Sequence, residues 1–162
     1  MMVELREIAW ENLWDIVSLK PAEKQKDFLP SNAIFMAMAY VNLKFQYPDA
    51  CFAVYHEETA VGFTKIVFVE KEENQFNLSE DSYLIDALMI DEKHQGRGYG
   101  RSALEQILSF IRTKPWGSSN YIRASCYDKN IVTGKLLESV GFIRTDEFDR
   151  GKVGLRVYIC AL

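Results

Sequence analysis

Cysteine and histidine are scarce in this chain of 162 residues, and their scarcity argues against two classes of site. Cys51, Cys126 and Cys160 are an odd number of cysteines without CxxC spacing, so neither a disulfide framework nor a zinc site is indicated. The two histidines, His56 and His94, do not stand at metal-ligand spacing. We therefore expect reduced thiols and no bound metal.

Long apolar runs and an excess of positive charge are also missing. No run approaches the ~20 residues that a membrane-spanning helix needs, and the start MMVELREIAW lacks the basic-then-apolar profile of a signal peptide. The 23 acidic against 19 basic side chains give a net charge of −4, which argues against a nucleic-acid partner, because such binding relies on neutralising phosphates. We expect a cytoplasmic protein with neither a membrane nor a nucleic acid as its partner.

What is present suits one globular domain. Hydrophobic residues make up 48% of the chain and charged residues 26%, and a chain of this size can bury ~68–70% of its unfolded surface around one core. No repeat, low-complexity tract or linker interrupts it. We expect residues 1–162 to form a single domain.

Apolar patterns predict the strands. SYLIDALMI, residues 82–90, is apolar except for Asp86, which is typical of a strand buried on both faces. The other predicted strands are residues 2–8, residues 121–127, a hairpin that turns at Glu57–Ala60, and a closing hairpin of FIRTDEF and LRVYICAL.

Helical spacing of apolar residues predicts four helices among these strands. The first includes Trp10 and Trp14 in its apolar stripe, Ser31 or Asn32 is placed to cap the second, and Gly141 is placed to end the fourth. The predicted helices are WENLWDIVSL, the segment that begins at PSNAIFMAMAYVNLKF, the segment from Arg101 to before Pro115, and NIVTGKLLESV. The fold class is α/β or α+β.

A glycine-rich loop, within DEKHQGRGYGRSALEQIL, joins the strand at 82–90 to the third helix. Gly96, Gly98 and Gly100 let the main chain turn sharply and approach a ligand closely. Free N–H groups and the helix dipole favour an anion there, and Arg97 and Arg101 add positive charge. Because the spacing G-x-G-x-G fits neither the dinucleotide pattern nor a Walker loop, we predict an anion site of another kind, with a plain solvent-facing turn as the alternative.

Two segments carry a family resemblance. LMIDEKHQGRGYGRSALEQIL resembles the acetyl-CoA-binding segment of the GNAT superfamily of N-acetyltransferases, Q/R-x-x-G-x-G/A, which Gln95, Gly98 and Gly100 match. NIVTGKLLESVGF resembles the second cofactor segment of that family, N-x-x-A-x-x-L-Y-x-x-x-G-F. The positions that fit it are Asn130, Leu136, Gly141 and Phe142.

The resemblance implies a mixed, strongly twisted sheet of about seven strands, flanked by helices and splayed between its fourth and fifth strands. Coenzyme A would lie in the splay, with its pantetheine along Leu88–Ile90 and its diphosphate on the N–H groups of residues 95–100. The implied cofactor-binding residues are Leu88, Met89, Ile90, Gln95, Gly96, Arg97, Gly98, Tyr99, Gly100, Arg101 and Asn130.

The N-terminal half suggests the substrate. QKDFLPSNAIFMAMAY and YPDACFAVYHEETAVGFTKIV resemble bacterial diamine, spermidine and spermine acetyltransferases, and Asp86 matches an acidic residue that those enzymes carry in the middle of a strand. A polyamine is a polycation, so Asp86 would hold its ammonium or take its proton. A nearby acidic group could attract it, with a solvated surface loop as the alternative. That group is Glu70, Glu72, Glu73, Glu80 and Asp81.

The implied reaction is direct attack of a neutral amine on the acetyl thioester. Deprotonating an alkylamine of pKa ~10.4 near pH 7.4 costs about 4 kcal/mol, so the base has the demanding role. Asp86 is our candidate, directly or through water, and the alternative is a buried acid satisfied by backbone or an arginine. The usual tyrosine acid is absent, because the sequence reads Leu136-Leu137. Tyr127 is our candidate in its place, with Cys126 or water as alternatives.

Several functions stay open at this point. The first is acetylation of a small polyamine, and the second is acetylation of a peptide, protein or antibiotic amine. The third is a non-catalytic acyl-CoA-binding regulatory module, which the leucine at position 137 suggests. Many members of the family are dimers, and the apolar LRVYICAL would offer an edge for a homodimer.

Overall fold

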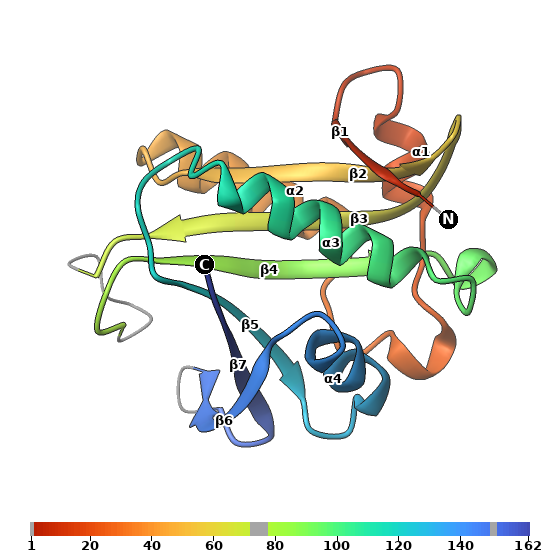
Figure 1. Ribbon diagram of the computed structural model, residues 1–162. Coiled ribbons are helices and arrows are strands. Elements are labelled where there is room, and N and C mark those ends of the chain that lie inside the picture. The colour runs from red at the N-terminus through yellow and green to blue at the C-terminus, as the bar shows by residue number, and fades with distance from the viewer. Residues whose placement is uncertain (1, 72–77, 150–151) are drawn as a thin grey trace.

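A computed structural model describes residues 2–71, 78–149 and 152–162, in which seven strands form one mixed sheet (Figure 1). The strands are β1 (Glu4–Glu7), β2 (Asp49–His56), β3 (Thr59–Val69), β4 (Ser82–Ile90), β5 (Tyr121–Tyr127), β6 (Ile143–Phe148) and β7 (Leu155–Ala161). Their order is β1-β2-β3-β4-β5-β7-β6, in which β4 and β5 run parallel and the other neighbours antiparallel. The predicted mixed sheet of about seven strands is confirmed.

The four predicted helices are present. They are α1 (Leu13–Ser18), α2 (Asn32–Lys44), α3 (Tyr99–Arg112) and α4 (Ile131–Glu138), with short 3-10 turns η1 (Glu23–Gln25) and η2 (Glu92–His94). The third begins at Tyr99 rather than at Arg101, and Gly141 has the predicted left-handed conformation, with φ 101°. Within the described ranges no helix is long and apolar enough to cross a membrane.

The helices cover both faces of the sheet, with α3 in front and α2 behind in Figure 1. On the α2 side, Ile16 and Phe35 pack with Phe63 and other buried strand residues. On the α3 side, Leu104, Ile107 and Ile111 pack with Tyr83, Ile85 and Ile122. The central strands are therefore buried between two helical layers, and no residue of β4 is exposed, as its apolar sequence predicts.

The predicted apolar stripe of the first helix is wrong. Trp10 and Trp14 are 80% and 73% exposed, whereas Ile16 is fully buried. The helix begins only at Leu13, so its face toward the sheet is the one that carries Ile16. Ser31 is the N-cap of α2, one of the two predicted positions, but its side chain makes no capping hydrogen bond.

The edge predicted for LRVYICAL is wrong as well. This segment forms β7, which pairs with β5 on one side and with β6 on the other. The outer strands of the sheet are β1 and β6. Strand β7 is therefore an inner strand, with a paired strand on each side among the described residues.

Candidate functional site

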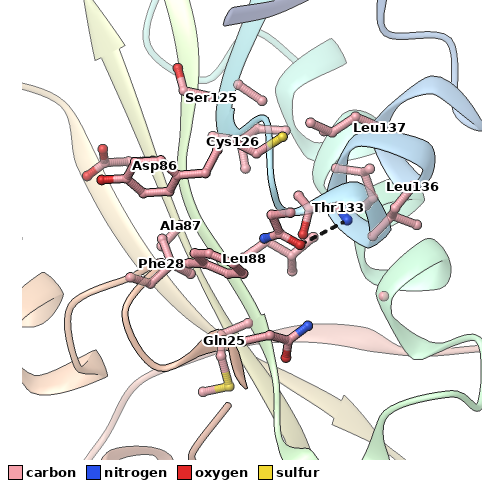
Figure 2. Close-up of a pocket in the computed structure, with 18 of the residues that line it drawn as sticks. Gln25, Phe28, Asp86, Ala87, Leu88, Ser125, Cys126, Thr133, Leu136 and Leu137 are labelled. Atoms are coloured by element: carbon pink, nitrogen blue, oxygen red, sulfur yellow. Dashed lines mark hydrogen bonds between the residues drawn. The ribbon is translucent and has the colours of Figure 1, made fainter. Parts of the chain in front are cut away.

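Strands β4 and β5 stay paired only from Tyr83 to Ile85, which face residues 122–124. Beyond this point β4 continues to Ile90 and β5 to Tyr127 with no mutual pairing among the described residues. The predicted splay between the fourth and fifth strands is confirmed. A cavity of about 630 Å³ lies where the strands part, and Figure 2 shows β4 on one side of it and β5 and α4 on the other. This volume is in the range of small-molecule sites.

Three further parts of the chain contribute to the cavity. An apolar wall comes from the segment between α1 and α2 and from α2 itself. Its residues are Phe28, Leu29, Pro30, Phe35 and Met38. The glycine loop, residues 95–100, and helix α4 form the second part, and residues at β6 and β7, among them Phe148 and Leu155, form the third. The cavity therefore joins an apolar surface to a loop of exposed main chain.

Asp86 is the extra residue of a β-bulge in β4. Lys65 is paired with Ala87 and Ile66 with Ile85, so Asp86 has no opposite residue on β3. A bulge changes the face on which the following side chains lie. Accordingly, Ile85 packs on the α3 side and Ala87 on the α2 side. The bulge brings Asp86 to the cavity lining, where the two strands diverge.

Asp86 belongs to a buried network of three charged side chains, Asp49, Lys65 and Asp86. Lys65 Nζ donates to Asp86 Oδ2 at 2.7 Å and lies 2.9 Å from Asp49 Oδ2. The side chains of Lys65 and Asp49 are 1% and 0% exposed, and that of Asp86 is 21% exposed. Of these three residues, Asp86 alone lines the cavity. The structure thus gives Asp86 an ion-pair partner while leaving it accessible.

Burial and charge act in opposite directions within this network. Burial disfavours the charged ammonium of Lys65, but the carboxylates of Asp86 and Asp49 outweigh burial and raise the Lys65 pKa. Burial also raises the pKa of Asp49, in spite of the nearby Lys65. The two carboxylates thus stabilise the charged form of Lys65 in spite of its burial. For Asp49, the loss of water contact outweighs the stabilisation by Lys65.

The glycine loop has the main-chain geometry of an anion site. Gly96 and Gly98 have φ of 76° and 83°, a left-handed region that favours glycine, and Gly98 is the N-cap of α3. Gln95 Nε2 donates to Ile90 O at 2.9 Å and to Gln25 Oε1 at 2.8 Å, which ties the loop to β4 and η1. Among the described residues, no main-chain N–H from 96 to 101 donates to a protein acceptor. These groups therefore remain available to a ligand.

The structure brings nearly all the predicted cofactor-binding residues together. All of them except Arg97 line the cavity. The Arg97 side chain is exposed, and Arg101 lies on the first turn of α3, where its Nε is 3.0 Å from Glu105 Oε1. Tyr99 is 5% exposed and packs into the core beside Ala103. Its ring therefore also supports the start of the helix.

Helix α4 forms the far side of the cavity. Asn130 is its N-cap, with Oδ1 accepting from Thr133 N at 3.4 Å, the dashed line in Figure 2. Leu136 packs closely on the glycine loop, because a Cβ added at Gly100 would lie 3.3 Å from Leu136 Cδ2. Leu137 is buried at 4% exposure. An apolar side chain thus occupies the position of the usual tyrosine.

Tyr127 lies at the end of β5, across the splay from Asp86, and both line the cavity. Its ring is 5.9 Å from that of Phe28, and the ammonium groups of Lys129 and Lys152 lie 5.7 and 5.1 Å from its centroid. Cys126 also lines the cavity, and burial raises the pKa of its thiol. The two predicted catalytic residues therefore share one cavity but lie on different strands.

The expected acidic surface is described only in part. Glu72 and Glu73 lie outside the described residues. Asp81 Oδ1 accepts from Lys71 N at 3.0 Å, and Glu80 Oε2 accepts from Asn120 Nδ2 at 2.8 Å. These two carboxylates therefore fasten neighbouring loops. Among the described residues, no group of three or more His, Cys, Asp or Glu could hold a metal ion.

Sequence reasoning missed the apolar wall and two members of the charged network. Lys65 stands alone among the apolar residues of FTKIVF, a pattern that signals a paired or functional charge in a buried strand. Asp49 has no comparable signal, because YPDA reads as an ordinary turn. Within the apolar wall, Phe35 and Met38 read as the core face of a helix, and Phe28 to Pro30 read as a connecting segment.

Comparison with known proteins adds a family match. The profile described as "Acetyltransferase (GNAT) family" matches residues 6–142. No curated protein matches the sequence.

Solved structures share the fold at low sequence identity. A PaiA N-acetyltransferase from Thermoplasma acidophilum in complex with coenzyme A has 11% identity and a TM-score of 0.68, with 100% of each chain covered. AAC(6')-Ib in complex with ribostamycin and coenzyme A has 15% identity and a TM-score of 0.76, with 99% of this chain and 94% of that chain covered. A spermidine N-acetyltransferase from Vibrio cholerae in complex with CoA and spermine has 16% identity and a TM-score of 0.65, with 99% and 95% covered.

Proposed function

Because this chain belongs to the acetyltransferase (GNAT) family, we propose that it transfers an acetyl group from acetyl-CoA directly to a primary amine, and that the acceptor is a polyamine such as spermidine or spermine. One observation carries the choice of acceptor. Asp86, at the bulge of β4, places an accessible carboxylate on the lining of a cavity that also has an apolar wall. A flexible aliphatic polycation matches both the carboxylate and the apolar wall.

The donor side of the cavity fits acetyl-CoA. The unpaired N–H groups of residues 96–101 and the positive end of α3 suit a diphosphate. The free edge of β4 from Leu88 to Ile90, which β5 leaves open, would pair with the amide groups of pantetheine. Asn130 and Leu136, at the start and inner side of α4, would close this part of the cavity.

In the proposed reaction a C–N bond forms between the neutral amine and the acetyl carbon, and the C–S bond breaks. Asp86, directly or through one water, would take the proton that the amine must lose. Tyr127 would return a proton to the departing thiolate. A thiolate of pKa ~8.5 gains only about 1.4 kcal/mol from protonation near neutral pH, so the loss of the family's tyrosine is tolerable.

An acceptor panel tests this proposal. Release of free thiol from acetyl-CoA would be followed with putrescine, spermidine, spermine, a lysine peptide and an aminoglycoside. We expect kcat/KM to be highest with a polyamine. Turnover of the peptide or the aminoglycoside without turnover of any polyamine would replace the proposed acceptor and keep the chemistry.

A second candidate function is a non-catalytic acyl-CoA-binding module. The buried Leu137 favours it, because this position lacks the phenol that usually protonates the thiolate. Tight binding of acetyl-CoA in calorimetry, with no thiol release across the whole panel, would select this candidate.

A further inference from the structure

We propose that Asp49, a residue outside the cavity, determines the preference for a cationic acceptor by giving the Asp49–Lys65–Asp86 network one more carboxylate than ammonium. This inference rests on the proposed function and concerns the same site. Lys65 is the positioning residue of the network, since its Nζ holds one oxygen of Asp86. The positive charge that balances the network is then the ammonium group of the acceptor.

The charge count is the first argument. An Asp86–Lys65 pair alone would be neutral, and a neutral pair would attract a cation only weakly. Asp49 Oδ2 lies 2.9 Å from the same ammonium, so with both carboxylates ionised the network carries one net negative charge. The next group in contact is uncharged, because Asn42 Nδ2 donates to Asp49 Oδ2 at 2.7 Å.

The cost of burying Asp49 is the second argument. Its side chain is 0% exposed, and among the described residues its Oδ1 accepts no hydrogen bond. An unsatisfied buried carboxylate oxygen destabilises a fold. An asparagine would keep the contacts of Oδ2 and carry no charge. Asp49 is therefore a poor choice for packing but a suitable one for setting the charge of the cavity.

The negative charge of Asp49 can act on a cation in the cavity, although Asp49 does not line it. Lys65 and Asp49 are screened from water, so their field weakens with distance less than that of surface charges. Asp86 is the member that contacts the cavity. A cation beside Asp86 would thus be attracted by the charge of Asp49, although the cation and Asp49 would not be in contact. Lys65 lies between the two carboxylates and contacts both.

The test compares Asp49→Asn with Asp15→Asn, a control that makes the same chemical change on an exposed residue of α1. Spermine is titrated calorimetrically into the protein loaded with coenzyme A, and KM is measured for spermine and for acetyl-CoA. We expect Asp49→Asn to weaken spermine binding and raise its KM about ten-fold, with the KM for acetyl-CoA unchanged. Asp15→Asn should behave as the wild type.

Lys65→Met provides the second variant. It removes the ammonium that contacts Asp86, and the ammonium of the acceptor can take that place, so spermine binding should weaken less than in Asp49→Asn, while kcat should fall because Asp86 loses its fixed partner. Equal losses of spermine binding in Asp49→Asn and Lys65→Met would indicate damaged packing and would overturn the inference. A spermine Kd for Asp49→Asn within about two-fold of the wild type would overturn it too.

Failure of the proposed acetyl transfer can be distinguished from failure of the proposed role of Asp49. If the wild type binds spermine but releases no thiol with any amine, acetyl transfer to amines is excluded, and the calorimetric comparison still decides the role of Asp49. If the wild type binds no polyamine at all, both proposals are overturned.

Discussion

At the scale of single residues, Asp86 combines two properties that rarely occur together. It is ion-paired with a fully buried lysine, and it is accessible from the cavity. An ion pair holds a side chain in one orientation, and accessibility allows that side chain to meet a substrate. A positioned carboxylate of this kind can act in binding, in proton transfer, or in both.

Replacing Asp86 separates these roles. We expect Asp86→Asn to lower kcat by about 100-fold, because the amine would then lose its proton to solvent. For the same reason the pH profile of kcat/KM should move to higher pH, while the KM for acetyl-CoA stays unchanged. Initial rates across neutral and alkaline pH, with Asp15→Asn as the control, check this. An unaltered profile would make Asp86 a structural residue.

The reactivity of the Cys51 thiol depends on the charges of the Asp49–Lys65–Asp86 network. Burial and, after it, the charge of Asp49 raise the pKa of Cys51 to about 12. The reactive thiolate is the deprotonated form, so at about pH 8 only about one molecule in ten thousand carries it. We expect iodoacetamide to label Cys51 far more slowly in the native protein than in guanidinium, as measured by mass spectrometry. Asp49→Asn should accelerate the labelling, and rapid labelling of the native wild type would contradict the expected burial.

At the scale of elements, one glycine of the glycine loop has a match in backbone φ elsewhere in the chain. Gly98 and Gly154 have φ of 83° and 84°, and an added Cβ at either position would meet nothing within 4 Å. Gly154 precedes β7 and does not line the cavity. The two glycines therefore share a positive φ that would strain a residue with a Cβ, and they differ in their position relative to the cavity.

This pair allows a controlled test of the loop. Gly98→Asp and Gly154→Asp should destabilise the protein by a similar ~1–2 kcal/mol, because both force a side chain into the left-handed region. Only Gly98→Asp should weaken acetyl-CoA binding, by about two orders of magnitude, since its carboxylate would repel a diphosphate. Melting temperatures and calorimetric Kd values give the two readouts. Equal acetyl-CoA affinity in both variants would remove the loop from the donor site.

The elements were largely predictable from sequence, because each is encoded locally. SYLIDALMI forms β4 with the predicted limits, and YIRASCY does the same for β5. The glycine loop and the splay followed from motif spacing that resembles a family. The buried face of α1 did not follow, since Trp14 looks as suitable for a core as Ile16.

The parts that were not predictable depend on contacts between distant segments. Asp49, Lys65 and Asp86 come from three strands, and the bulge that aligns them is visible only in the pairing of β3 with β4. The inner place of β7 likewise depends on the order in which the strands assemble. Local patterns carry no information about either arrangement.

At the scale of the whole molecule, the tryptophans distinguish the outside of the protein from its core. Trp10 and Trp14 are exposed near α1, whereas Trp116 packs against Tyr83 and Phe110, with ring centroids 6.0 and 5.7 Å apart. We expect acrylamide to quench most of the fluorescence of the wild type. A Trp10→Phe/Trp14→Phe variant should retain a blue-shifted emission from Trp116 that is quenched weakly.

Protein concentration is the control for this experiment. The homodimer remains a prediction, and a dimer that covers α1 would protect both exposed indoles at high concentration and release them on dilution. Weak quenching of the wild type at every concentration would contradict the exposed positions of Trp10 and Trp14.

The cavity has one further consequence, which follows from how its lining is distributed along the chain. The apolar wall comes from residues 28–38, and the glycine loop and α4 come from residues 95–138. We therefore expect substitutions among residues 28–38 to change the binding of the proposed acceptor more than the binding of acetyl-CoA. The apolar wall is in this sense a separable part of the cavity, and exchanging residues 28–38 with those of a relative, while keeping the Gln25 contact to the glycine loop, is a direct test of its influence on the acceptor.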